Sequence, residues 1–555
     1  MNAKNRSLTA FLVVPALLLA VSCPERDEGF LPDISLLEQR GVLDEHLVYI
    51  DQANDLAYMI DVATDDPEPR PVSVELPRNP LLVQRRNGDQ PGAGNHENEL
   101  LILCQGQEET EEEEEQAPSL AALNDHGEVR VYWLKSCFNG VRQSPDGRYA
   151  FLFFDESSGE GAACGGTKLS QHVTMIDLNG EPDETAEPYI ELVAWDSNEP
   201  RQVVFSPEMS IPGLAGTRRF AVVLTNTLVW FLDLGDSGSR PVAFEPVIGK
   251  QTGPSRVVFN PEQGQIYLLA EDSDDVYIMD LSAAEAGSGA NDFEIKDTAR
   301  SAGAGPSDLA VYSDGELSRL LVLSPGSNEA VIIDPDTSLE AEAGTAPRDS
   351  SSWPVRVPLQ AAADTILFFE GGDTEDTSTD EPRALLYAAN SSSVAFLDLS
   401  AIEVNKQRNL QTVSLTRPYQ HLIEWDDNTV LLVTEGFGLS LLDLEKRTIT
   451  GIEVDSSLSL KPDRAVSKLW LTPTGDKRLR YLTVGTPEDE DELFAGDVLL
   501  DHGIEKLIRL TTGERKRLVV EHASEVGFIT ILDAEQPEID TAVSLKGFFL
   551  ADVLD

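Results

Sequence analysis

Residues 385–399 of the 555-residue chain read LLYAANSSSVAFLDL, two apolar runs separated by a short polar segment. The first run is Leu385–Ala389 and the second is Val394–Leu397. The Asn and Ser residues between them favour a tight turn, because their side chains hydrogen-bond to nearby backbone groups. Asp398 closes the second run. The segment therefore predicts a β-hairpin whose second strand ends at an aspartate.

The same pattern of apolar residues followed by Asp recurs along the chain. Its copies are YMID ending at Asp61, AALND at Asp125, VTMID at Asp177, VWFLD at Asp233, VYIMD at Asp280, AVIID at Asp334, VAFLD at Asp398, LSLLD at Asp443, VLLD at Asp501 and FITILD at Asp533. We call the aspartate that ends a copy the repeat aspartate. Most successive copies lie about 45 to 65 residues apart, a period typical of solenoids, propellers and other arrays.

Each repeat also contains further predicted strands. A strand is expected before most copies, at 150–154, 220–224, 266–270, 320–323, 385–389 and 430–433. Apolar stretches closed by a turn lie further upstream, at 203–207, 257–261 and 469–473, and we assign them to first strands. A fourth strand is expected near Pro358 and at Thr412–Leu415. Each repeat thus reads as four antiparallel strands.

A four-stranded unit of about 50 residues cannot bury both of its faces alone, and stacked neighbours cover those faces in a β-propeller. A parallel α/β fold would need amphipathic helices between strands, whereas the intervals in this chain are rich in Gly, Pro, Ser and Asp. We predict an all-β propeller of about eight to ten blades in one ring. Two smaller packed propellers remain the alternative, because ten copies exceed the usual four to eight blades.

Two segments carry a resemblance to a known family. Residues 386–399 resemble the YVTN family of bacterial propeller repeats, and Ser144–Ala150 (SPDGRYA) is similar to that family's first turn and second strand. As a pattern the resemblance covers roughly residues 41 to 550. It implies a propeller fold and an extracytoplasmic setting, and it implies no catalytic residues.

The two ends of the array suggest how the ring closes. The first repeat reads as beginning with its second strand, Leu47–Ile50, and the chain ends with an additional apolar stretch, Gly547–Leu550. We predict that this C-terminal stretch supplies the missing innermost strand of the first blade, which would hide two exposed strand edges.

The N-terminus has the features of an export signal. Lys4 and Arg6 precede an apolar run, Leu8–Val21, that is interrupted by Pro15 and ends at small residues. Such a run is short for a membrane span and typical of a signal peptide. Residues 19–23 (LAVSC) resemble the lipobox of bacterial lipoproteins, which implies lipidation of Cys23, although Ala20 departs from the Leu or Val that the lipobox prefers. The predicted organisation is a signal peptide at 1–22, a tether at 23–40 and the propeller at 41–555.

The charge excludes one class of partner. The chain has 97 acidic and 42 basic residues, a formal net charge of −55. Nucleic acid is therefore not expected as a partner, because phosphate binding depends on clustered Lys and Arg. Such a charge keeps a protein soluble by self-repulsion. Together with the N-terminal export signal and the resemblance to YVTN repeats, this charge predicts a protein at a bacterial outer membrane or cell surface. The lipid anchor would be its only attachment to the membrane.

No recognised catalytic or metal motif stands out. The seven His lack the HxH or HExxH spacing of metal sites, and no nucleophile elbow, Walker loop or Rossmann fingerprint is present in a suitable context. His126 and His502 stand in identical Asp-His-Gly segments that we assign to turns after third strands. Acidic runs at 108–115, 271–275, 373–381 and 488–492 are expected in solvated loops. We predict no cofactor, while calcium stays possible at these carboxylates.

Three cysteines follow Cys23, so at most one disulfide forms within the propeller. Cys104 is expected at the end of a second strand, Cys137 after the fourth strand of that blade and Cys164 in the next blade. Alternating strand directions place all three on one face. The preferred pair is Cys137 with Cys164, the alternative is Cys104 with Cys137, and buried reduced thiols remain open.

Two functions fit these observations. The first is a non-catalytic lipoprotein that binds a protein or polysaccharide through loops at one rim of the propeller. The second is a calcium-dependent hydrolase or lyase of the lactonase sort, which would need Asp, Glu and Asn on several innermost strands. The first strands read as apolar, for example Leu309–Val311, and this favours the binding function.

Overall fold

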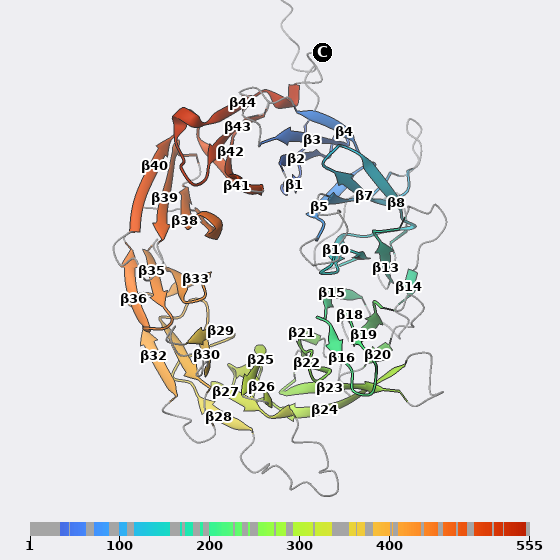
Figure 1. The fold of residues 1–555 in the computed structure, drawn as a ribbon, viewed down its shortest axis with the longest axis vertical. Coiled ribbons are helices and arrows are strands. Elements are labelled where there is room, and N and C mark those ends of the chain that lie inside the picture. The colour runs from blue at the N-terminus through green and yellow to red at the C-terminus, as the bar shows by residue number, and fades with distance from the viewer. Residues whose placement is uncertain are drawn as a thin grey trace, which may run out of the picture.

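The chain forms a closed ring of β-sheets (Figure 1). The computed structural model describes residues 34–550 except 44, 63–70, 88–98, 108–115, 156–166, 169–171, 181–188, 192–198, 226–227, 236–241, 245–253, 271–272, 285–291, 315–316, 336–353, 362, 372–380, 400–401, 403–408, 435–437, 453–458, 473–474, 485–492, 513–514 and 525–526. Within these residues the strands build ten four-stranded antiparallel sheets. The predicted all-β propeller is confirmed, as one ring of ten blades and not two smaller propellers.

In every blade the strands follow one another from the innermost to the outermost. Blade 1 is β1 (Gly41–Leu43), β2 (His46–Asp51), β3 (Leu56–Asp61) and β4 (Val72–Glu75); blade 2 is β5 (Pro80–Arg85), β6 (Glu99–Cys104), β7 (Ser119–Asn124) and β8 (Val129–Trp133). Blade 3 is β10 (Gly140–Gln143), β11 (Tyr149–Phe153), β13 (His172–Asp177) and β14 (Tyr189–Glu191); blade 4 is β15 (Pro200–Phe205), β18 (Phe220–Thr225), β19 (Val229–Asp233) and β20 (Val242–Phe244); blade 5 is β21 (Pro254–Asn260), β22 (Gln265–Ala270), β23 (Asp275–Ala283) and β24 (Phe293–Ser301).

Blades 6 to 10 keep the same order. Blade 6 is β25 (Asp308–Asp314), β26 (Leu317–Ser324), β27 (Glu329–Ile333) and β28 (Val355–Pro358); blade 7 is β29 (Thr365–Gly371), β30 (Glu381–Tyr387), β31 (Ser393–Asp398) and β32 (Leu410–Ser414). Blade 8 is β33 (Tyr419–Asp426), β34 (Thr429–Thr434), β35 (Gly438–Asp443) and β36 (Thr448–Ile452); blade 9 is β37 (Ser459–Asp463), β38 (Lys468–Thr472), β39 (Arg478–Val484) and β40 (Leu493–Leu499); blade 10 is β41 (Ile504–Thr512), β42 (Arg515–His522), β43 (Phe528–Asp533) and β44 (Val543–Lys546).

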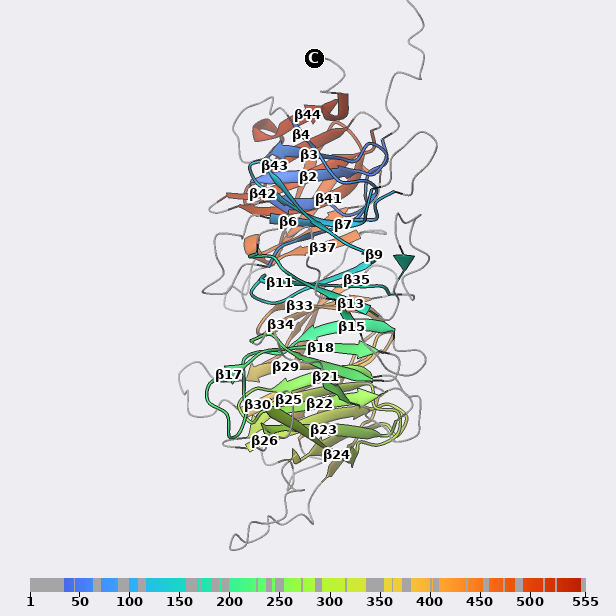
Figure 2. The same cartoon turned by 90° about the vertical axis from the view of Figure 1, so that its right-hand side faces the viewer.

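Small elements complete the described residues. Two-residue strands pair outside the blades, β9 (Ser136–Cys137) with β12 (Thr167–Lys168) and β16 (Met209–Ser210) with β17 (Thr217–Arg218). Three short 3-10 helices are η5 (Arg464–Val466), η6 (Ile539–Thr541) and η7 (Phe548–Leu550). Seen edge-on, the strands run across the ring from one rim to the other (Figure 2). No helix in the described part of the chain is long and apolar enough to cross a membrane.

The core of the protein lies between the blades. Side chains on a strand alternate between its two faces, so each blade can pack against both neighbours. In β11, Ala150 and Leu152 pack toward blade 2, whereas Phe151 and Phe153 pack toward blade 4. Among the described residues, ten buried apolar clusters occupy the ten blade-to-blade interfaces. Double-sided burial explains why second and third strands read as continuous apolar runs.

Most of the strand assignments made from the sequence are confirmed, and blade 9 holds the exceptions. Asp501 follows the fourth strand β40, so VLLD does not end a third strand, and β39 takes that place. The stretch 469–473, assigned to a first strand, belongs largely to the second strand β38. Because β38 is buried throughout, its continuous apolar pattern resembles that of an inner strand. The true inner strand, β37, reads SLKPD and carries little apolar pattern.

The predicted mode of closure is wrong in one respect. Blade 1 has its own innermost strand, β1, which pairs with β2, so no C-terminal strand is inserted there. The C-terminal stretch instead forms η7, and its two Phe side chains join a cluster shared by blades 10 and 1. The ring therefore closes through side-chain packing. The contacts begin before β1, because the Leu37 amide donates a hydrogen bond to the Ile50 carbonyl at 2.9 Å.

Candidate functional site

The cysteines are the first residues that the sequence analysis singled out. Cys23 and Cys164 lie outside the described residues, so lipidation of Cys23 stays a prediction. Cys104 is a free, buried thiol at the end of β6, and burial raises its pKa. The alternative Cys104–Cys137 pair is therefore not formed. Cys137 is disulfide-bonded, and the pairing of β9 with β12 brings it beside Lys168, four residues after Cys164. The preferred pair stays a prediction.

The two Asp-His-Gly segments differ in their surroundings. His126 is exposed in the β7–β8 turn, where its amide donates to Asn124 Oδ1 and Gly127 has a φ of 79°. His502 follows a fourth strand, so its assignment to a turn after a third strand is wrong. Its ring lies 4.5 Å from that of Phe528, and the neighbouring His522 is buried. His522 Nε2 lies 2.8 Å from Thr530 Oγ1, and burial lowers the pKa of this imidazole.

The acidic runs fall almost entirely outside the described residues, at 108–115, 271–272, 373–380 and 485–492. Within the part of the chain that the structure describes, no group of three His, Cys, Asp or Glu side chains could hold a metal ion. The described residues therefore provide no candidate site for calcium.

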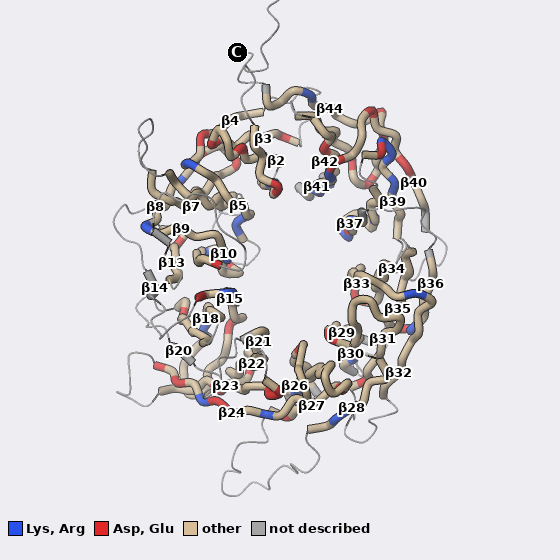
Figure 3. Tube along the Cα trace, turned by 180° about the vertical axis from the view of Figure 1, so that it is seen from behind, with Lys and Arg blue, Asp and Glu red and all other residues tan. Residues whose placement is uncertain are grey.

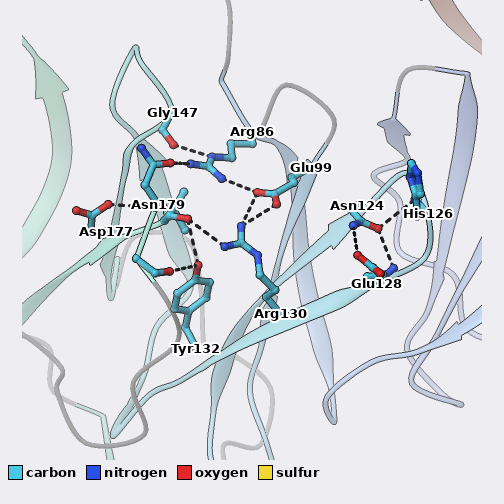
Figure 4. Close-up of polar contacts among 12 residues, drawn as sticks. Arg86, Glu99, Asn124, His126, Glu128, Arg130, Tyr132, Gly147, Asp177 and Asn179 are labelled. Atoms are coloured by element: carbon cyan, nitrogen blue, oxygen red, sulfur yellow. Dashed lines mark hydrogen bonds and ion pairs between the residues drawn. The ribbon is translucent and has the colours of Figure 1, made fainter. Parts of the chain in front are cut away.

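A polar network joins blades 2 and 3 (Figure 4). Arg86 Nη1 and Arg130 Nη2 bind Glu99 at 2.5 and 2.7 Å, and the Arg86 side chain is only 2% exposed. Arg86 Nε donates to the Gly147 carbonyl at 2.7 Å and Nη2 donates to Asn179 Oδ1 at 2.6 Å. Nearly every donor of Arg86 has an acceptor within the protein. The network therefore holds two blades together and leaves little capacity for a ligand.

The innermost strands carry more charge than their sequence pattern suggested. Basic residues occur on β5, β10, β15, β21, β37 and β41, and acidic residues occur on β25, β29, β33, β37 and β41 (Figure 3). Lys461 of β37 donates to the Leu507 carbonyl at 2.9 Å, and burial together with nearby Lys506 and Arg509 lowers its pKa. Arg256 pairs with the buried Asp308 at 2.6 Å. The expectation of apolar first strands thus holds for only part of each strand.

A cavity of about 510 Å³ lies among blades 6, 7 and 8. The side chains that line it come from β25, β29, β30 and the β33–β34 turn: Val311, Tyr312, Phe368, Phe369, Pro382, Arg383 and Asp427. Five of these seven are apolar or aromatic, and only Arg383 and Asp427 are charged. The volume of this cavity falls in the usual range of ligand pockets. We call it the blade 6–8 pocket.

Arg383 distinguishes this pocket. Its Nε is buried, and its guanidinium forms no hydrogen bond or ion pair with any described residue. A second cavity, of about 410 Å³, lies at blade 10 and contains Arg517, but that arginine pairs with Asp533 at 3.9 Å. The Arg383 charge also acts on its surroundings, because the pKa of Arg447 is lowered by burial and, after that, by Arg383. The pocket thus contains a cation for which the described residues supply no partner.

Neither the pocket nor Arg383 was predicted from the sequence. The lining residues span positions 311 to 427 and three blades, so no local motif joins them. One signal was available. An arginine just before or near the start of a second strand recurs in several repeats, and it pairs with the repeat aspartate in blades 3, 4, 6 and 10.

No protein family model and no curated protein matches the chain. The resemblance to YVTN repeats therefore stays a prediction. Similar solved structures include a eukaryotic initiation factor, with a TM-score of 0.41 and 10% identity over 89% of this chain and 94% of that one. Dihydro-heme d1 dehydrogenase NirN gives a TM-score of 0.38 at 11% identity over 84% and 78%. Saccharomyces cerevisiae Sqt1 gives 0.37 at 10% identity over 70% and 93%. At these values the likeness is one of general fold.

Proposed function

We propose that the protein is an exported, lipid-anchored β-propeller that binds an extracytoplasmic ligand without transforming it. The blade 6–8 pocket carries this proposal. It combines aromatic walls from two blades with one cation that has no partner among the described residues, an arrangement suited to holding a ligand. Its charged groups are a guanidinium and a single carboxylate, which offer a ligand anchors of both signs.

The proposed location follows from the N-terminal sequence. Lipidation at Cys23 would tether the ring to a bacterial outer membrane or cell surface, where proteins, polysaccharides and small molecules outside the cytoplasm reach the pocket. The ten interfaces of the ring make a rigid support for such a pocket, because each is filled by a buried apolar cluster. Binding residues held by a rigid scaffold lose little conformational entropy when the ligand docks.

Two measurements test the proposal. Metabolic labelling with a fatty acid should mark the wild type and the Cys104→Ala control, whereas Cys23→Ala should take up no label. Labelled Cys23→Ala would rule out this anchor.

For the binding function, the purified chain is mixed with a panel of small acids, oligosaccharides, peptides and lactones, with added calcium or with chelator. Ligands should raise the melting temperature and be recovered chemically unchanged. Calcium-dependent turnover of any member of the panel would contradict the binding function and favour the hydrolase alternative.

A further inference from the structure

We propose that the blade 6–8 pocket takes a monocarboxylate attached to an apolar body, with Arg383 as the anchor for the carboxylate. This inference rests on the proposed function, because it names the ligand class for the same pocket. Such a carboxylate could belong to a free small organic acid or to the carboxyl end of a peptide chain.

The first step is the comparison of Arg383 with its counterparts in other blades. In blade 6, Arg319 pairs with the repeat aspartate Asp334 at 3.0 Å, with the two side chains 6% and 2% exposed. In blade 7, Arg383 stands opposite the repeat aspartate Asp398 in the strand register. Nevertheless, no ion pair links Arg383 to this or any other described residue. The arginine of the repeat is thus diverted from its usual partner at the blade that contributes most to the pocket.

The second step is the cost of that diversion. A guanidinium stays protonated in proteins, so a buried Nε without an acceptor leaves a charged donor unsatisfied. Such a group lowers stability unless an anion binds it. A ligand carboxylate would satisfy Arg383 through two parallel hydrogen bonds, which is the geometry that guanidinium favours. Arg319 and Arg517 also have a buried Nε without an acceptor, but their terminal nitrogens pair with aspartates, whereas no described residue pairs with those of Arg383.

The third step concerns the rest of the ligand. Tyr312 of blade 6 and Phe368 of blade 7 have ring centroids 6.1 Å apart, and Phe369 packs edge-on against Phe396 at 5.9 Å. Phe369 stands opposite Arg383 in the register of β29 and β30, and Tyr312, Phe368 and Pro382 also line the cavity. Burying an apolar body against these side chains stabilises the complex, at roughly 25 cal/mol for each Å² removed from water. The pocket therefore suits an aromatic or branched aliphatic group.

The fourth step limits the charge of the ligand to one negative unit. Asp427 is exposed at the same pocket, and the whole chain carries a net charge of −55. One carboxylate is compensated by Arg383, whereas a second would meet the Asp427 carboxylate and the acidic surface without a counter-charge. A dicarboxylate or an acidic polysaccharide is disfavoured on this ground.

The experiment uses calorimetry on the full chain with matched probes. The free-acid probe is 3-phenylpropanoate, with 3-phenylpropanamide as its neutral counterpart and benzylmalonate as the dicarboxylate. The peptide probe is a pentapeptide ending in Phe, tested with a free and with an amidated C-terminus. We expect at least one of the two acids to bind, and its amide to bind at least tenfold more weakly. The stronger acid identifies the source of the ligand, and benzylmalonate should bind more weakly than 3-phenylpropanoate.

Three variants test whether Arg383 binds the carboxylate of the ligand. Arg383→Gln should lose at least tenfold in affinity for the acid and little for the amide, while Arg142→Gln, the same change on the inner strand of blade 3, should bind as the wild type does. Asp427→Asn should bind benzylmalonate more tightly. Without ligand, Arg383→Gln should melt at or above the wild-type temperature, whereas a structural role for Arg383 would lower it.

Three outcomes overturn the inference. They are equal affinity for acid and amide, unchanged binding of the acid to Arg383→Gln, and no binding of either acid. None of these outcomes decides whether the protein is a binding protein, which the broader panel of ligands tests separately. If the amides bind and Phe368→Ala weakens them, the pocket binds ligands and only the carboxylate assignment fails. If no member of the panel binds, the function itself fails.

Discussion

The repeat aspartate pairs with the arginine of the preceding strand in several blades, and its surroundings decide how much each pair contributes. Arg148 and Asp177 in blade 3 are 3.1 Å apart, with side chains 50% and 39% exposed. Arg319 and Asp334 in blade 6 lie at a similar distance but are almost fully buried. Water and salt screen the first pair, whereas loss of one partner from the second leaves a buried charge without compensation.

We therefore expect unequal results from one substitution at two equivalent positions. Asp334→Asn should lower the free energy of unfolding by about 3 kcal/mol or more, because Arg319 stays buried and charged. Asp177→Asn should lower it by less than about 1 kcal/mol. Urea denaturation of both variants measures the difference. Equal losses would show that burial does not set the contribution of these pairs.

His522 gives the stability of the ring a dependence on pH. Its ring nitrogens lie 3.0 Å from the Gly503 carbonyl and 2.8 Å from Thr530 Oγ1. Burial is the main cause of its lowered pKa, and the neighbouring His502 lowers it further, while Asp501 raises it. A base with a lowered pKa in the folded state takes up its proton more readily when the chain is unfolded, so its contribution to stability falls as the pH drops through about 6.5.

The test compares His522→Gln with the wild type. The substitution should remove part of the loss of stability between about pH 7.5 and pH 5.5, an interval that brackets the ordinary His pKa. His126→Gln is the control, because that ring is 77% exposed. Melting temperatures across this range should converge for His522→Gln and the wild type at low pH. Parallel curves would contradict the assignment.

At the scale of single elements, turn glycines show how neighbouring blades constrain one another. Gly147 has a φ of 65° in the turn that follows β10, and a Cβ built there would lie 1.7 Å from the Asn87 carbonyl oxygen. Gly305 has a similar φ of 58°, with no atom within 4 Å of its Cβ position. Both positions need the left-handed backbone that glycine adopts without strain. Only Gly147 also needs the close approach of blade 2.

Gly147→Ala should therefore be more destabilising than Gly305→Ala. Both variants lose about 1–2 kcal/mol to the left-handed backbone. Gly147→Ala should lose roughly a further 1–3 kcal/mol, because the backbone of Asn87 must move. Thermal unfolding of the two variants checks this order. Equal melting temperatures would mean that the turn relaxes without cost.

The elements also show what the sequence could and could not predict. Apolar runs ending in an aspartate marked nine of the ten third strands, because those strands are buried on both faces. In blade 9 the third strand β39 reads RLRYLTV and lacks the aspartate, so the pattern points instead to the next apolar run, which ends at Asp501. Inner strands are partly exposed, as in β33, where only Tyr419 and Trp425 are buried and polar residues lie between them. The pocket depends on those strands, so it had no local signature.

At the scale of the whole molecule, the ring depends on one junction where the ends of the chain meet. Phe548 and Phe549 of η7 pack against Tyr49 of β2 at centroid distances of 5.2 and 5.8 Å, and Phe549 also lies 5.4 Å from Tyr58 of β3. The apolar character of residues 547–550 indicated burial correctly, but Gly547 has a φ of 74° and the stretch turns into a 3-10 helix. The three-residue β1 is too short to be recognised from its sequence, so the prediction assigned the first blade one strand too few.

This geometry changes what removal of the C-terminus should do. If residues 547–550 formed a strand, deleting them would expose two sheet edges and cause aggregation. Because blade 1 and blade 10 each keep four strands, the loss should be that of packing alone. Phe548→Ala with Phe549→Ala should lower the free energy of unfolding by about 3–5 kcal/mol for each ring removed. Thermal unfolding and size-exclusion chromatography distinguish the two cases, since we expect a lower melting temperature in a protein that stays monodisperse. A chain ending at Leu550 is the control, because it keeps both rings. An unchanged melting temperature in the double variant would mean that the ring closes without these side chains.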